Sequence, residues 1–314
     1  MLPLPNYVLV ANDPLISVVI PTVNRSHIVV RAARSALAQT LDAIEVIVIV
    51  DGPDETTLDA LLGVEDPRLR VKPLAQRVGS GAARNAGVAE ARAEWVAFLD
   101  DDDQWDPRKL EIQLDAANST SHRYPIVACR LVARDGKEEV IWPRRFPRSD
   151  EPISEYLFTR ARLSWGEGLI QTSTILTRKE LLERVPFRVD LKKHDDWDWL
   201  LRASALDGVG VAFVPTLEPL AIWNREQDRP RRSAPDWRFS VAWLRENREL
   251  VTPRAFASFL LTVVSGDAVR QRSYRAFWLL PWMAIRHGKP RALDLLLHLG
   301  TWLAPQGLRR AVGR

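Results

Sequence analysis

Four consecutive acids, Asp100–Asp103, are the residues of this 314-residue chain whose type and spacing point most directly to chemistry. Adjacent carboxylates repel one another, and the repulsion is relieved by solvent, by protonation or by a bound cation. Mg²⁺ and Mn²⁺ prefer carboxylate oxygens and often take one or two of them together with the phosphates of a substrate. A run of acids is usually a solvated loop. This run directly follows the apolar segment Trp95–Leu99, which favours a metal site.

A second acidic cluster, His194-Asp195-Asp196-Trp197-Asp198-Trp199, stands at the expected start of a helix. Carboxylates at that position can cap the helix and suit the positive end of its dipole. A carboxylate beside the apolar rings of Trp197 and Trp199 can instead act as a general base that accepts a proton from a hydroxyl. The spacing alone leaves both interpretations open.

The segment Gly79–Gly87, GSGAARNAG, opens another expected helix. Free backbone N–H groups at a helix start attract anions. The segment is not a P-loop, because GxxxxGK[ST] is absent, and it does not follow the first strand as a dinucleotide fingerprint does. Arg84 within it has the planar guanidinium that binds phosphate or carboxylate through two hydrogen bonds.

Strands alternate with helices over the first hundred residues. The four expected strands cover residues 16–21, 44–50, 69–72 and 95–99, and the helices between them cover 27–40, 54–62 and 79–93. Continuous apolar, β-branched runs are typical of strands buried on both faces, and this alternation predicts a mainly parallel sheet. Ligands bind beyond the carboxyl ends of such strands. We therefore expect the loops after the first, second and fourth strands to meet at one edge.

The pattern changes after Leu99. A helix is expected over 107–117, a hairpin over 126–133 and 138–142 through an Asp-Gly turn, a strand over 169–176, a helix over 197–206 and a strand over 209–214. An Arg- and Pro-rich stretch follows residue 224, and the rest reads as helical from about residue 237. We expect an N-terminal tail over 1–14, an α/β domain over 15–225, and a linker with a basic helical extension over 226–314.

Composition limits the class of protein. The chain is 46% hydrophobic and 27% charged with a net charge of +4, which excludes disorder as the dominant state. A single cysteine, Cys129, excludes an internal disulfide and a Cys-rich zinc site, and it fits a reducing cytosol. The longest apolar stretches are shorter than the roughly 18–20 residues that span a bilayer. We expect a cytoplasmic protein, with contact to the cytoplasmic membrane face left open.

Charge is concentrated at one end. Residues 270–314 hold nine Lys or Arg and one acid, a net +8, which leaves −4 for residues 1–269. The same segment is rich in Trp and Leu, so it either lies on an anionic membrane surface or packs its apolar side on the main domain. Pro281 and Pro290 divide it into short pieces, which favours packing. A nucleic-acid partner is disfavoured, because no recognition motif accompanies the basic residues.

Five segments in series resemble the family 2 glycosyltransferases, which are nucleotide-sugar enzymes with the GT-A fold. They are SVVIPTVNR (17–25), VIVIVDGPDETT (46–57), GSGAARNAG (79–87), WVAFLDDDDQWDPRKLE (95–111) and HDDWDWLLRAS (194–204). The resemblance covers about residues 15–225. It implies an α/β GT-A domain with a Rossmann-like nucleotide-binding sheet flanked by helices.

The resemblance also implies roles for particular residues. Contacts to the nucleotide and donor sugar fall on Pro21, Thr22, Asn24, Asp51, Asp54, Arg84, Asp100 and Asp101. Asp100 and Asp102 match the family's DxD pair, with Asp102 the better metal ligand and Asp103 a further contact. Asp196 matches the catalytic base, and Asp195 stands where Glu is more usual, so the choice between these two stays open. The turn VDGPDETT is one residue shorter than the commoner VDDGSTD.

The implied reaction is inverting, metal-dependent transfer of a sugar from a nucleotide-diphosphate donor, UDP being the commonest base, to an acceptor hydroxyl. The cofactor is Mn²⁺ or Mg²⁺, and the expected role is hexosyltransferase-type synthesis of bacterial cell-surface polysaccharide or glycolipid. One alternative is a sugar-phosphate nucleotidyltransferase, whose glycine-rich loop after the first strand is absent from PTVNRSH. Another is a non-catalytic nucleotide-sugar-binding or membrane-associated scaffold, against which both acidic motifs argue.

Overall fold

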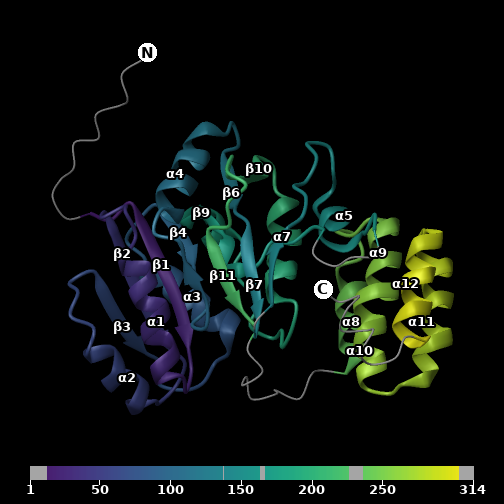
Figure 1. The fold of residues 1–314 in the computed structure, drawn as a ribbon, viewed down its shortest axis with the longest axis horizontal. Coiled ribbons are helices and arrows are strands. Elements are labelled where there is room, and N and C mark those ends of the chain that lie inside the picture. Colours follow the sequence, from purple (N-terminus) through teal and green to yellow (C-terminus); the bar gives the residue numbers. More distant parts are fainter. Residues whose placement is uncertain (1–12, 137, 163–166, 226–235, 304–314) are drawn as a thin grey trace.

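The computed structural model describes residues 13–136, 138–162, 167–225 and 236–303. A large sheet with helices on both faces, a smaller sheet and a helical region lie next to one another in that order (Figure 1). The predicted α/β class is confirmed.

The large sheet has seven strands in the order β10-β6-β9-β4-β1-β2-β3. They are β1 (Ile16–Thr22), β2 (Ile44–Val50), β3 (Leu69–Pro73), β4 (Trp95–Phe98), β6 (Tyr124–Ala128), β9 (Leu176–Arg178) and β10 (Val209–Phe213). β9 runs antiparallel to both of its neighbours, so the other six strands share one direction. The sheet is therefore mainly parallel, as the alternating pattern predicts.

The central strands are buried on both faces. Successive side chains of a strand point to opposite faces, and in β1 Val18 and Ile20 enter one apolar cluster while Val19 enters another. Helices α1 (Ser26–Leu37) and α2 (Glu55–Leu62) pack together, and α3 (Ser80–Glu90) contacts β1 and β2. A Cβ on Gly87 would lie 2.2 Å from Val19 Cγ1, so glycine lets α3 approach the sheet.

The second half departs from the predicted elements in two places. The expected strand 126–133 is two strands in different sheets, because the chain leaves β6 and enters the four-stranded sheet β5-β11-β7-β8. The expected strand 169–176 begins instead as a 3₁₀ turn, Thr172–Thr174, where the Gln171 side chain accepts the Ser173 N–H. Such local side-chain bonds compete with a strand ladder.

The remaining elements of the α/β part are the strands of the small sheet and the helices α4 to α7. The small sheet has β5 (Gln104–Trp105), β7 (Leu131–Asp135), β8 (Glu138–Trp142) and β11 (Ala221–Asn224). The helices are α4 (Lys109–Ser119), α5 (Ile153–Phe158), α6 (Lys179–Arg184) and α7 (Asp195–Ser204). The β7–β8 hairpin turns through Gly136, whose φ of 62° matches the predicted Asp-Gly turn.

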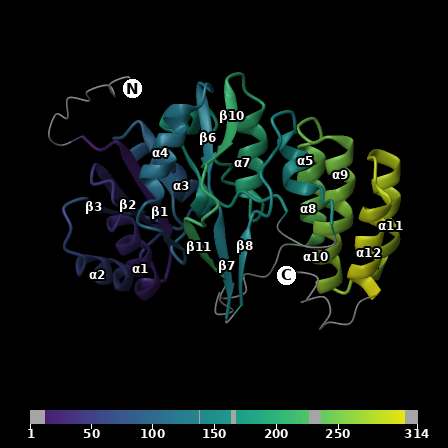
Figure 2. The same ribbon diagram turned by 45° about the horizontal axis from the view of Figure 1, so that its top comes forward.

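The C-terminal part is helical and packs on the α/β part. Its elements are α8 (Trp237–Glu246), α9 (Pro253–Phe259), the π-helical segment η2 (Leu260–Val264), α10 (Ser265–Arg270), α11 (Tyr274–His287) and α12 (Ala292–Leu303). Phe158 of α5 and Leu201 of α7 join its apolar core. A second view shows α8 and α9 next to α5, with α11 and α12 beyond them (Figure 2). Among the described helices, none combines the length and the apolar character needed to cross a membrane.

Candidate active site

The loops after β1, β2 and β4 meet at one edge of the large sheet. β1 and β2 pair in parallel up to Thr22 and Val50, and the Asp51 N–H donates to Thr22 O at 2.8 Å. The Thr22 hydroxyl donates to Asp101 Oδ2 at 2.7 Å. The predicted convergence of these strand ends is present in the structure.

Two of the residues assigned to the nucleotide hold neighbouring loops together. The Asn24 N–H donates to Asp54 Oδ2 at 2.7 Å, with Asn24 in the left-handed region at φ 54°. Asp54 also caps α2, since its Oδ1 accepts from Thr57 N–H at 3.1 Å. These bonds join the loop after β1 to the loop after β2. Pro21 lies in β1, one residue before the strand ends at Thr22.

Asp51 anchors the glycine segment. It is buried, and its two oxygens accept from the N–H groups of Val78 and Gly79 at 2.6 and 3.0 Å. Gly79 has φ +92°, a conformation open to glycine but rarely to other residues, and it leads directly into α3. The Asp51 side chain thus sets the backbone path toward Arg84.

The four acids after β4 face different partners. Arg25 Nη1 donates to Asp101 Oδ1 at 2.7 Å and to Asp102 Oδ2 at 3.1 Å. Asp100 accepts from Arg84 and, at 3.1 Å, from Gln171 Nε2. Burial raises the pKa of Asp101 to about 6, although the nearby Arg25 charge opposes that shift. The repulsion within the run is thus relieved by two arginines as well as by hydrogen bonds.

Asp103 points into the protein. It is fully buried and accepts from the Ser173 hydroxyl at 2.6 Å, from Gln171 Nε2 at 2.9 Å and from the Asn224 N–H at 3.1 Å. Burial, and then the charges of the neighbouring acids, raise its pKa well above the usual range. The Asp103 oxygens therefore join the end of β4 to η1 and β11, and the metal contact through Asp103 stays a prediction. Among the described residues, no group of three His, Cys, Asp or Glu side chains is arranged to hold a metal.

Arg84 joins the two acidic motifs. Its side chain is buried, with Nη1 2.5 Å from Asp195 Oδ2 and Nη2 2.9 Å from Asp100 Oδ1. Burial alone lowers the pKa of a guanidinium, but the two carboxylates more than offset this and raise the pKa of Arg84 above its usual value. The arginine therefore stays charged and fixes α7 against the end of β4.

Asp195 and Asp196 are adjacent in sequence but differ in environment. Asp195 accepts from Arg84 and from the Ser80 hydroxyl, and despite burial these contacts lower its pKa. Asp196 accepts the Trp197 N–H at 2.8 Å and forms no ion pair with any described residue. Burial and the Asp195 charge raise the pKa of Asp196 to about 7. Neither acid is the N-cap, a position that His194 occupies, so the capping interpretation does not account for them.

The C-terminal helices hold the residues in front of these acids. His194 is buried in the left-handed region at φ 69°, and its Nε2 lies 2.8 Å from the Ser240 hydroxyl of α8. Lys193 forms an ion pair with Asp267 of α10. The start of α7 is therefore fixed by Arg84 on one side and by α8 and α10 on the other.

The profile of the family described as "Glycosyl transferase family 2" matches residues 17–185, more than half of the chain. The chain belongs to this family. The family consists of transferase enzymes, and the match includes the loops after β1, β2 and β4, α3 and η1, but ends before α7, β11 and the C-terminal helices. The family match therefore does not include the second acidic motif, and the assignment of Asp195 and Asp196 rests on their contacts in the structure.

Two curated relatives are similar to this glycosyltransferase chain. Succinoglycan biosynthesis protein ExoO of Rhizobium meliloti is 30% identical over 199 residues, which are 62% of this chain and 56% of that protein. Amylovoran biosynthesis glycosyltransferase AmsB of Erwinia amylovora is 27% identical over 251 residues, 77% of this chain and 80% of that protein. The chain thus spans only about half the length of ExoO.

Two solved structures share the fold. S. aureus TarS 1-349 in complex with UDP-GlcNAc matches with a TM-score of 0.56 at 18% identity, over 94% of this chain and 92% of that one. Mannosyltransferase PcManGT from Pyrobaculum calidifontis, in complex with GDP-Man and Mn²⁺, matches with a TM-score of 0.50 at 18% identity, over 96% and 74%. These likenesses support the GT-A fold of this glycosyltransferase.

Several site residues of the glycosyltransferase were not predicted from the sequence. They are Arg25, Gln171, Ser173, His194 and Asn224, which hold the acids in place. A usable signal existed for two of them, because the polar run Gln171-Thr-Ser-Thr interrupts an otherwise apolar strand pattern. Most of the Arg- and Pro-rich stretch that follows residue 224, including the arginines at 229, 231 and 232, lies outside the described residues.

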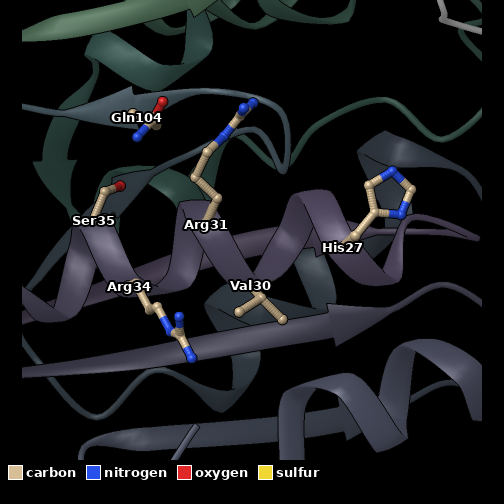
Figure 3. A pocket seen from close by; sticks show the side chains of 6 residues that line it. All are labelled: His27, Val30, Arg31, Arg34, Ser35 and Gln104. Atoms are coloured by element: carbon tan, nitrogen blue, oxygen red, sulfur yellow. The ribbon is translucent and has the colours of Figure 1, made fainter. Parts of the chain in front are cut away.

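A hollow of about 390 Å³ lies along α1, beside the acid loop (Figure 3). Three basic side chains, His27, Arg31 and Arg34, line it together with Val30, Ser35 and Gln104. Arg31 extends toward the strand that carries Gln104, and its Nη2 donates to Asp102 O at 3.2 Å. None of the acids assigned to the donor, the metal or the acceptor is among the side chains that line this hollow.

Proposed function

We propose that this chain is an inverting glycosyltransferase that moves a sugar from a nucleotide-diphosphate donor, with UDP-sugars tested first, to an acceptor hydroxyl. The observation that carries the proposal is the division between Asp195 and Asp196. One carboxylate is held ionised by Arg84, and its neighbour has no ion pair with a described residue and a pKa near 7. Neighbouring acids whose environments push their pKa values apart indicate an acid–base site.

In the proposed reaction, Asp196 accepts the proton of the acceptor hydroxyl while that oxygen attacks the anomeric carbon from the face opposite the leaving group. The transition state has oxocarbenium character, as in glycoside hydrolysis. Arg84 and Asp195 position the start of α7, and burial together with the Asp195 charge keeps the proton affinity of Asp196 high enough to accept a proton. The nucleotide would be received by Pro21 and Thr22 at the end of β1 and by Asn24, Asp51 and Asp54 in the loops after β1 and β2.

The residues present fit a divalent cation held jointly with a diphosphate. Asp100 and Asp102 supply hard carboxylate oxygens, and one or two such ligands plus phosphates are the usual set for Mg²⁺ or Mn²⁺. When bound, the cation neutralises negative charge on the leaving diphosphate. Arg25 already neutralises Asp101 and Asp102 in this structure, which keeps the loop in place without the ion.

We propose an acceptor in bacterial surface polysaccharide or glycolipid synthesis, supported by the names of ExoO and AmsB. We further propose residues 15–225 as the catalytic domain and 226–314 as a linker and extension, acting in the cytoplasm. Contacts between α5 and α9, and between α7 and the helical core, suggest that the extension stabilises the catalytic domain.

The test is donor turnover by the full chain with UDP-, GDP- and dTDP-sugars, with Mn²⁺ or with EDTA. Asp196→Asn should lower turnover by about 10²–10⁴-fold, the usual contribution of a general base, and should leave donor binding within a few-fold. Asp207→Asn, an exposed acid beyond the end of α7, is the matched control. Donor binding without turnover in the wild type would favour the non-catalytic alternative, and unchanged turnover in Asp196→Asn would exclude Asp196 as the base.

A further inference from the structure

Helices α11 and α12 form the outer layer of the helical region (Figures 1 and 2). Both contact η2 and α10. α11 packs inward through Ala276, Leu280 and Met283, and α12 through Leu297. Because both helices pack on the same elements, their opposite faces point away from the rest of the protein.

These outward faces are apolar. Fourteen large hydrophobic side chains are exposed in the described part of the chain, and eight of them lie on these two helices. They are Tyr274, Trp278, Leu279, Trp282, Ile285, Leu296, Leu299 and Leu303, and we call them the outer apolar face. Trp278 is 77% exposed and Trp282 58%. Single exposed apolar residues are ordinary, but a cluster containing two tryptophans marks an interaction site.

On each of the two helices, exposed apolar residues follow one another along one face. Residues 274, 278, 282 and 285 follow one another at intervals of four, four and three, and residues 296, 299 and 303 at three and four. Residues three or four apart lie on the same helix face. Each helix therefore presents one continuous apolar stripe.

The exposed charged side chains along residues 271–303 are all basic. Arg275 directly follows Tyr274, the first residue of the α11 stripe, and Arg286 and Lys289 follow the last one, Ile285; all three basic residues are exposed. The one acid of residues 271–303, Asp294, is fully buried and accepts from the Ser258 hydroxyl. The outer apolar face is thus bordered by positive charge with no exposed carboxylate along these residues.

We propose that the outer apolar face docks on a membrane surface that contains anionic lipids. Exposed Trp and Leu side chains enter the boundary between headgroups and acyl chains, while Arg and Lys beside them attract lipid phosphates. A second copy of the chain fits less well, because a two-fold interface would bring the same positive charges face to face. This proposal does not depend on the proposed reaction.

The test is sedimentation of the full chain with phosphatidylcholine vesicles, with and without phosphatidylglycerol. The wild type should bind the anionic vesicles at least about tenfold more tightly, since each basic residue near the surface adds attraction. Binding should weaken as salt rises from about 0.1 M to about 1 M, because the screening length falls from about 10 Å to about 3 Å. A wild type that stays in the supernatant with anionic vesicles would overturn the proposal.

Matched variants locate the contact. Trp278→Ser with Trp282→Ser should weaken vesicle binding by about tenfold or more, because it removes the two largest side chains of the face. Leu62→Ser, on α2 and 78% exposed, should bind like the wild type. Arg286→Glu should weaken the preference for anionic vesicles, because it replaces one of the attracting charges by a repelling one. Light scattering is the second measurement: a wild-type dimer that the double Trp variant dissociates, without vesicle binding, would assign the face to self-association and overturn the proposal.

Discussion

Arg84 Nη1 lies 2.5 Å from Asp195 Oδ2, which joins α3 to the first turn of α7 across 111 residues of sequence. The same guanidinium reaches Asp100 at the end of β4. The buried Arg84 guanidinium therefore connects Asp100, a proposed metal ligand, with Asp195, the neighbour of the proposed base. Asp196 remains outside this ion-pair network.

Replacing Arg84 should affect stability and turnover together. Arg84→Ala leaves Asp100 and Asp195 facing each other without their cation, and removing one partner of a buried pair costs about 3–5 kcal/mol, less here because both acids are partly exposed. We expect a loss of about 2–4 kcal/mol in urea unfolding. Arg84→Lys keeps the charge but not the two-pronged geometry, so it should recover stability more than turnover. An unchanged urea midpoint in Arg84→Ala would contradict this assignment.

Turnover should depend on the protonation of Asp196. A base with a pKa of about 7 is protonated below that pH, so turnover at saturating donor should rise with pH up to about 7 and then level off. Asp195→Asn removes a negative neighbour, so the rising limb should move to lower pH. The check is a pH–rate profile of both proteins, and a limb unmoved in Asp195→Asn would contradict the coupling.

The same group should make stability depend on pH. The folded-state pKa of Asp196 is raised above its ordinary value of 3.8. Folding therefore favours the protonated form, and stability is lost as pH rises from about 4 through about 7. Asp196→Asn cannot ionise and should lose less stability over this interval. Urea midpoints measured across the interval test the sign, and parallel curves for the two proteins would refute it.

Asp102 and Asp103 should respond differently to the same change. Asp102→Asn should weaken the Mn²⁺-dependent thermal shift produced by UDP, because a ligand that binds only the folded state stabilises it by mass action. Asp103→Asn places an amide against the donors Ser173, Gln171 and Asn224, and an unsatisfied buried polar group costs about 1–3 kcal/mol. We expect Asp103→Asn to lower the melting temperature without UDP. The reverse pattern would make Asp103 the metal ligand.

The contact between Ser240 of α8 and His194 should affect turnover, although Ser240 lies outside the site. Ser240→Ala removes the hydrogen bond to His194, and a typical net contribution is about 0.5–1.5 kcal/mol. Because His194 directly precedes the two acids, kcat should fall while donor KM stays within about twofold. Ser119→Ala, an exposed serine bonded within α4, is the control. If kcat fell equally in both variants, the hydrogen bond from Ser240 would have no role in positioning the two acids.

Local sequence patterns were sufficient for the first half of the fold. Apolar runs predicted β1, β2 and β4 close to their observed bounds, because a strand buried on both faces is encoded in consecutive residues. The edge strand β3, which is only half-buried, was predicted from its place in the alternation of strands and helices. The convergence of Asp51 and Asp100 follows from the common direction of parallel strands. Short elements such as β5 and β11 carry too few residues for a periodic signal, and the break between β6 and β7 depends on which sheet each segment joins.

The sequence by itself determined the family, the parallel sheet and the acidic motifs at its edge. Tertiary structure alone separated Asp195 from Asp196 and turned Asp103 inward, because those differences come from Arg84, Ser173 and Asn224, which lie far away in sequence. It also decided which sides of α11 and α12 are buried. Periodicity marks the apolar side chains of a helix. Whether protein covers them depends on where the helix packs, and here it leaves Trp278 and Trp282 exposed.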